Sequence, residues 1–218
     1  MKVKITQPTS LKDIKLSQYQ KFVRTTKDSE DNNFVTRQMI SIFCNVPDNV
    51  VGQIKASDYD SIVADLTKVL EMKAEFVPTF KMDGVEYGFI PELEDITVDE
   101  KADLDTFYKE IDTMDKAMAV LYRRITIKKG KKYLIEDYDT DNKDSVTSLD
   151  VTLDVALGAN VFFSLLMTDL LNFTQNYIAQ EVEHNPKVSQ ILEQNGVGSI
   201  AFINSLQETF SSLTKLVS

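Results

Sequence analysis

The most constraining feature of this sequence is the segment VALGANVFFSLLM, residues 155–167, which is apolar on nearly every side of a helix. A helix that is apolar all round must be buried all round. One interpretation makes it the central helix of the domain, within a span predicted from about Leu149 to Glu183. The alternative reserves one face for a partner, with Phe162, Phe163 and Leu166 as the candidate contact residues. Gly158 and Ala159 permit close helix approach in either case.

The rest of the pattern predicts an α+β protein that is predominantly helical. Apolar spacings of three and four predict helices that begin near Ser17, with Ser17 and Gln20 as a capping box, at Ser57 and at Thr97. Residues 76–90 predict one β-hairpin, with its turn at Asp83-Gly84, and residues 123–138 a second one around Gly130. The helix after Thr97 is expected to break near Asp112-Thr113.

We expect one compact domain over residues 1–218, because no long linker, low-complexity segment or internal repeat interrupts the pattern. Its predicted parts are an N-terminal strand with helices (1–75), the hairpins with an acidic helix (76–138), and a helical C-terminal part (149–218).

The stretch YGFIPELEDITVDEKADLDTF, residues 87–107, raises the question of a carboxylate site. Seven of its residues are Asp or Glu, and a catalytic or metal site would need two of them to converge in a cleft. Lysines lie among the acids, and Asp99 and Glu100 suit the positive end of a helix dipole. We therefore interpret this stretch as the outer face of a structural helix.

Residues 123–132 carry six basic side chains and no acidic ones, in a chain whose net charge is −10. Such a basic hairpin could touch phosphate, since Tyr122 and Tyr133 flank it. The acidity of the rest of the chain argues against nucleic acid as the main partner. A docking tip for an acidic surface, including another copy of this chain, is the other interpretation. The candidate contact residues are Arg123, Arg124, Lys128, Lys129, Lys131 and Lys132.

Other patterns that can carry chemistry fit their templates poorly. Asp137, Asp139 and Asp141 resemble the start of an EF-hand loop, but the required glycine and final glutamate are missing. Cys44 lies in an apolar run, which indicates a buried, inert thiol. His184 is the single histidine, and no phosphate-binding loop, dinucleotide fingerprint or nucleophile elbow occurs. We therefore predict no catalytic or metal-binding residues, no cofactor and no small-molecule substrate.

Neither the N-terminus nor the apolar window at residues 155–167 predicts membrane insertion. The N-terminus lacks the apolar core of a signal peptide, and the 13 residues of the apolar window are fewer than the roughly 20 that a membrane-spanning helix needs. The expectation is a soluble protein that makes no membrane contact in its folded state.

Four segments together resemble a known family: LSQYQKF (16–22), the acidic stretch 87–107, DKAMAVLYRRI (115–125) and LDVALGANVFFSLLMTDLLNFT (153–174). They look like small acidic proteins encoded among the structural genes of short-tailed bacteriophages, including crAss-like phages of Bacteroides. The resemblance spans about residues 10–175. Relatives are labelled tail assembly chaperones or virion structural proteins, and in crAss-like phages the resemblance implies cargo carried inside the tail.

The resemblance implies a non-enzymatic virion protein of the tail, either an ordered component or cargo. Its expected partners are other virion proteins of the tail, portal or ring, and copies of itself. Its expected location is the virion, and the host cytoplasm during assembly. The first alternative is a tail assembly chaperone that is absent from mature virions. The second is an enzyme that uses Asp/Glu chemistry with a divalent metal.

Overall fold

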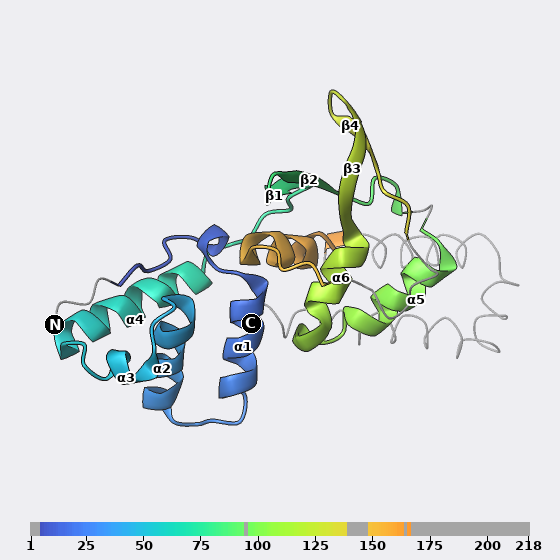
Figure 1. Cartoon of the computed structure of the whole chain (residues 1–218). Helices are drawn as coiled ribbons and strands as arrows, with labels where there is room; N and C mark the ends of the chain where they lie inside the picture. Colours follow the sequence, from blue (N-terminus) through green and yellow to red (C-terminus); the bar gives the residue numbers. More distant parts are fainter. Residues whose placement is uncertain (1–4, 94–95, 139–147, 164, 167–218) are drawn as a thin grey trace, which may run out of the picture. The chain divides into compact units, whose positions relative to one another are not determined.

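The computed structural model describes residues 5–93, 96–138, 148–163 and 165–166 (Figure 1). Contacts along the chain divide it into two compact units, residues 1–158 and 159–218. Most of the second unit lies outside the described residues, so the single domain expected from the sequence stays a prediction. The same holds for the predicted helices after residue 186, for His184 and for the Asp139–Asp141 loop.

The N-terminal part of the first unit is helical, as its apolar spacing predicts. Its core contains Ile14, Ile40 and Leu66, each with no solvent exposure, and the single thiol, Cys44, which is 6% exposed. The helix of residues 32–43 ends at Phe43, Asn45 follows with a φ of 54°, and Pro47 is the N-cap residue of the next helix. The elements are η1 (Leu11–Asp13), α1 (Leu16–Thr26), α2 (Asn32–Phe43), α3 (Asp48–Val51) and α4 (Ala56–Leu70).

The predicted capping box at the start of α1 is wrong by two residues. Lys15 is the N-cap residue, and the side-chain Oε1 of Gln18 accepts a hydrogen bond from the Lys15 amide at 2.9 Å. Gln20 is instead buried, and it donates to the Ile111 carbonyl at 2.8 Å. Ser17 bonds to a residue far along the chain, and that partner could not be read from local spacing.

That distant partner belongs to a short extended segment, residues 149–152, which lies against the start of α1. The Ser17 amide and hydroxyl donate to the two carboxylate oxygens of Asp150 at 2.8 and 2.9 Å. Backbone hydrogen bonds run from the Leu16 amide to the Val151 carbonyl and from the Leu153 amide to the Ile14 carbonyl, each at 2.8 Å. Asp150 therefore satisfies an amide at the N-terminus of α1 from across 133 residues of chain.

Four antiparallel strands form one sheet in the order β1-β2-β3-β4, with bounds β1 Thr79–Met82, β2 Val85–Phe89, β3 Tyr122–Lys129 and β4 Lys132–Ile135. The sequence predicts two hairpins, whereas the structure joins all four strands, because β2 also pairs with β3. Asp83 and Gly84 have φ angles of 50° and 80°, as a tight two-residue turn between β1 and β2 requires. Gly130 has a φ of 63° in the turn between β3 and β4.

The acidic stretch forms α5 (Val98–Phe107), followed by η3 (Ile111–Thr113) and α6 (Met114–Leu121). Thr97 caps α5 in a capping box with Glu100, which confirms the predicted start. The expected break also occurs, between residues 107 and 114. Asp105 and Asp112 are exposed, as the outer-face interpretation requires. Glu100 is not: it is 4% exposed, so the interpretation is wrong for this carboxylate. Asp103 is half-buried and accepts a hydrogen bond from Tyr138, so it also departs from a fully exposed face.

The apolar segment begins its helix at Leu153 rather than Leu149, and residues 153–163 and 165–166 are helical. The long central helix is not confirmed, because the rest of its predicted span lies outside the described residues. Gly158 does permit close approach: a Cβ on this residue would lie 2.2 Å from the Glu75 carbonyl oxygen. The coarse prediction of a mixed α+β fold is confirmed by these helices and the antiparallel sheet.

Candidate functional site: a clamped β-hairpin with a basic tip

The distal part of β3 and β4, residues 127–134, is the feature of the described chain that looks most like a contact surface, and we call it the distal arm. Residues Tyr122 to Arg124 of β3 pair with β2, whereas the residues beyond them pair with β4. Figure 1 shows these two strands continuing past β1 and β2. Most side chains of the distal arm are exposed.

The first strand of the arm is held at its base by Arg123. Its Nη2 donates to the Oε1 of Glu100 on α5 at 2.6 Å, and the two side chains are only 14% and 5% exposed. The other oxygen of Glu100, Oε2, accepts the Thr97 amide at 2.6 Å. Glu100 therefore both completes the helix cap and pairs with Arg123, and both of its oxygens have partners.

The second strand is held by Tyr138, three residues after β4 ends. Its hydroxyl donates to the Oδ2 of Asp103, one helical turn after Glu100, at 2.5 Å. The guanidinium of Arg123 lies over the Tyr138 ring, 5.7 Å from its centroid. Burial and the neighbouring Asp103 carboxylate raise the pKa of Tyr138 well above its ordinary value. Two carboxylates of α5 thus fix both strands at the base of the arm.

A third anchor is Tyr133 of β4, whose side chain reaches the end of β2 and the residue before β1. The Tyr133 hydroxyl donates to the carbonyls of Phe89 and Pro78, at 2.9 and 3.2 Å. Its ring occupies the space above Gly88, where a Cβ would lie 2.4 Å from the Tyr133 Cε2 atom. Gly88 is therefore required for Tyr133 to lie across the sheet. Lys128, the register partner of Tyr133, forms an ion pair with Glu86 on the same face.

The other face of the distal arm is apolar and exposed. Ile127 and Leu134 are register partners on β3 and β4, and they are 61% and 58% exposed. Cross-strand partners share one face of a sheet, so these side chains form a single apolar patch. Lys129 and Lys132 are the next register pair on this face, whereas Lys128 lies on the opposite face with Tyr133.

The predicted basic contact residues therefore divide into two groups. Arg123 belongs to the buried base, whereas Arg124, Lys128, Lys129, Lys131 and Lys132 are exposed. Our reading of the sequence missed the partners of Arg123 and Tyr138 on α5, since they lie 23 and 35 residues away. It also missed the apolar pair of Ile127 and Leu134, because a register shift between Ile125 and Ile127 places these two isoleucines on opposite faces of the strand. Strict alternation of side chains along a strand does not predict such a bulge.

The apolar candidate residues belong to the second unit, and their solvent exposure differs. Phe162 and Phe163 are half-buried, and their rings contact each other edge-on with centroids 5.6 Å apart. Leu165 and Leu166 are 62% and 42% exposed. Leu166 is therefore exposed, whereas the side chains of Phe162 and Phe163 are partly buried.

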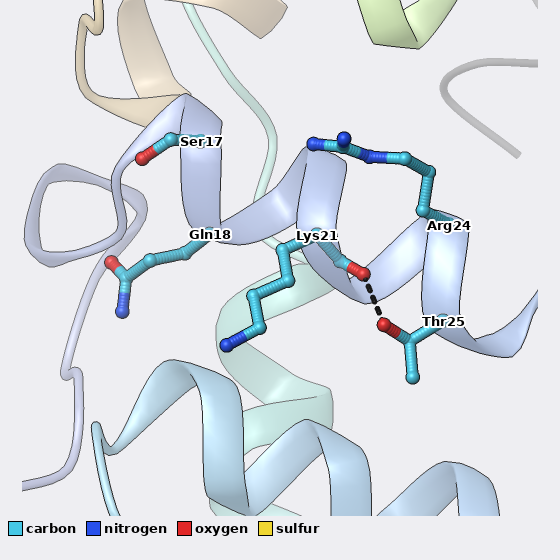
Figure 2. Close-up of a pocket in the computed structure, with 5 residues that line it drawn as sticks. All are labelled: Ser17, Gln18, Lys21, Arg24 and Thr25. Carbon is cyan, nitrogen blue, oxygen red and sulfur yellow. Dashed lines mark hydrogen bonds between the residues drawn. The ribbon is translucent and has the colours of Figure 1, made fainter.

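A shallow hollow of about 550 Å³ lies along α1, lined by Ser17, Gln18, Lys21, Arg24 and Thr25 (Figure 2). Most of its polar groups already have partners. Arg24 pairs with Asp112 at 3.1 Å, Gln18 donates to the Ile42 carbonyl, and the Thr25 hydroxyl donates to the Lys21 carbonyl. We therefore assign no ligand to this hollow.

We next consider a reactive thiol, a metal site and a membrane-spanning helix among the described residues. Burial raises the pKa of the Cys44 thiol to about 11, which keeps it protonated at neutral pH. Within residues 5–93, 96–138, 148–163 and 165–166, no three His, Cys, Asp or Glu side chains come together in a way that could hold a metal ion. Over the same residues, no helix has the length and apolar character to cross a bilayer.

Comparisons with models of known protein families, with curated proteins and with solved structures gave no match.

Proposed function

We propose that this chain is a non-enzymatic protein of a bacteriophage tail, an ordered component of the virion or cargo carried in it. The observation that carries the proposal is the clamped arm, whose exposed apolar pair and lysines suit contact with another protein. The assignment to a bacteriophage tail rests on the resemblance of residues 10–175 to small acidic tail-module proteins.

Two features of the arm favour a role in protein contacts. Its base is fixed to α5 by a buried ion pair and by the hydrogen bond from Tyr138 to Asp103. A surface that is already ordered loses little conformational entropy when it binds. The carboxylates that first suggested catalysis act instead as anchors, with Glu100 and Asp103 each bound to a side chain of the arm's base.

The proposed partners are other virion proteins of the tail, portal or ring, together with copies of this chain. The proposed location is the virion, preceded by the host cytoplasm during assembly. The distal arm and the exposed Leu166 are the proposed contact sites, and neither requires a cofactor or a small-molecule substrate.

A second candidate function is that of a tail assembly chaperone that leaves before the virion matures. The exposure of Leu165 and Leu166, at 62% and 42%, favours it, because a chaperone must offer apolar surface to its client. The two functions differ in whether the chain stays in the finished particle.

The test is the protein composition of purified particles, measured by quantitative mass spectrometry with isotope-labelled standard peptides. The same measurement is made on infected cells and on particles emptied of DNA. Many copies in intact particles support the virion proposal, and retention or loss on emptying separates an ordered component from cargo. Abundance in cells with absence from particles would refute it in favour of the chaperone.

A further inference from the structure

We propose that the distal arm docks on the acidic surface of a second copy of this chain, so that copies join head to tail. This inference rests on the proposed role in protein contacts and names the partner of that same surface. It depends on the described residues of the arm, on their internal partners and on the charge of the chain.

The first argument is the composition of the distal arm. Ile127 and Leu134 lie side by side on one face and are 61% and 58% exposed. The next register pair on the same face is Lys129 and Lys132. An apolar pair beside charged side chains resembles the centre and rim of a small protein interface. Covering the pair removes apolar surface from water, which favours association.

The second argument is charge complementarity. Residues 127–134 carry four lysines and no carboxylate, and since the whole chain carries −10, the remainder carries −14. Many carboxylates of that remainder are exposed, including Asp58 and Asp60 on α4 and Asp99 and Asp105 on α5. Opposite charges of this kind steer two copies together and fix their orientation. The same net charge repels nucleic acid and anionic membranes, which leaves an acidic protein as the suitable partner.

The third argument is that the arm's lysines are mostly unused within one copy. Lys128 pairs with Glu86, but the ion pairs among the described residues include none to Lys129, Lys131 or Lys132. The clamp at the base keeps these three lysines at the end of an ordered hairpin. They are therefore available to the carboxylates of another copy.

The geometry of such a contact is heterologous, because the arm and the acidic surface are different parts of the chain. Two arms carrying like charge repel each other, which disfavours a symmetric arm-to-arm dimer. Head-to-tail contacts generate a ring when the rotation closes and an open filament when it does not.

The experiment uses the full chain in two isotopic forms, unlabelled and ¹⁵N-labelled, mixed in equal amounts. A carbodiimide joins lysine amines directly to carboxylates that touch them, and mass spectrometry identifies the peptides. Links that combine one labelled and one unlabelled peptide come from two different copies. We expect such mixed links from Lys129, Lys131 or Lys132 to exposed carboxylates, together with concentration-dependent assembly in sedimentation velocity at low salt.

Charge reversal supplies the matched comparison. The arm variant changes Lys129, Lys131 and Lys132 to Glu, and the control changes Lys12, Lys21 and Lys73 to Glu, which alters the net charge equally. We expect the arm variant to weaken self-association by about 100-fold, because like charges then face each other, while the control has much less effect. Unchanged circular dichroism and melting of both variants show that the fold is intact.

Three results would overturn the inference: a monomer at every concentration, arm links only within one copy, or equal weakening by both variants. These results concern the purified chain, whereas the proposed function is tested on particles. A chain that assembles through its arm but is missing from particles refutes the virion role alone. A chain present in particles but monomeric in solution refutes this inference alone.

Discussion

The Nη2 atom of Arg123 lies 2.6 Å from the Oε1 atom of Glu100, in a pair whose side chains are 14% and 5% exposed. This contact joins the first strand of the arm to the first turn of α5. Buried charges are costly unless they are paired, so each side chain requires the other.

Replacing Glu100 by Ala should destabilise the protein by about 3–5 kcal/mol, since it leaves the Arg123 charge buried without its partner. The measurement is the free energy of unfolding from urea denaturation. Asp105→Ala, an exposed position on the same helix, is the control and should change stability by less than about 0.5 kcal/mol. Adding Arg123→Met to Glu100→Ala should recover part of the loss. If Glu100→Ala is as stable as the control Asp105→Ala, the ion pair of Glu100 and Arg123 contributes little to stability.

Gly158→Ala should destabilise the first unit, because the new Cβ would lie 2.2 Å from the Glu75 carbonyl oxygen. Overlap with backbone costs about 1–3 kcal/mol or more, which exceeds the roughly 1 kcal/mol that alanine gains in helix propensity. Gly52→Ala is the matched control, since its nearest neighbour is 3.5 Å away and its φ is −62°. That control should be neutral or stabilising by up to about 1 kcal/mol. The measurement is the melting temperature, and a higher melting temperature for Gly158→Ala than for the unmodified protein would contradict the close contact.

Tyr133→Phe should loosen the arm without unfolding the protein. The variant removes the hydrogen bonds to the carbonyls of Phe89 and Pro78, at a cost of about 1 kcal/mol. Hydrogen exchange measured by mass spectrometry should become faster in peptides that cover β4, and Tyr87→Phe, whose ring stacks on Phe80, should leave that exchange unchanged. If hydrogen exchange in β4 is equally fast in Tyr133→Phe and in the unmodified protein, the Tyr133 hydroxyl does not anchor the arm.

The Cys44 thiol should react slowly with a thiol reagent at pH 8 in the folded protein, and quickly once the protein is unfolded. Burial raises its pKa from an ordinary value near 9.0 to about 11, so the folded state holds the proton more tightly than the unfolded state. The associated stability is therefore complete below about pH 9 and is lost as the pH rises toward 11. Cys44→Ala should show a smaller loss of stability between these pH values. Rapid labelling of the folded protein would contradict the burial.

The local features of this fold could be predicted from the sequence, and the long-range ones could not. Thr97 and Glu100 lie three residues apart, so their capping box is visible in the sequence, and the positive φ angles at Asp83-Gly84 follow from the residue types. The capping of α1 depends on Asp150, and its position is set by tertiary packing rather than by neighbouring residues. For that reason the predicted box at Ser17 and Gln20 was wrong.

The candidate site shows the same division. The lysines of the distal arm are visible as a run of charge, and their exposure follows from the cost of burying them. The base of the arm depends on which carboxylates of α5 face the sheet. Glu100 and Asp103 share one side of the helix, but their partners are Arg123 of β3 and Tyr138, which follows β4 by three residues. The sequence does not specify the register of these strands.

The attachment of residues 149–153 to the start of α1 affects how the chain folds during synthesis. Leu16 and Ser17 emerge from the ribosome before their partners Val151 and Asp150, which are made more than 130 residues later. At about 5–20 residues per second, the N-terminal helices wait roughly 7–27 seconds before their edge can close. A nascent chain therefore carries an open edge at α1 throughout that interval, and the edge closes only after residues 149–153 have been made.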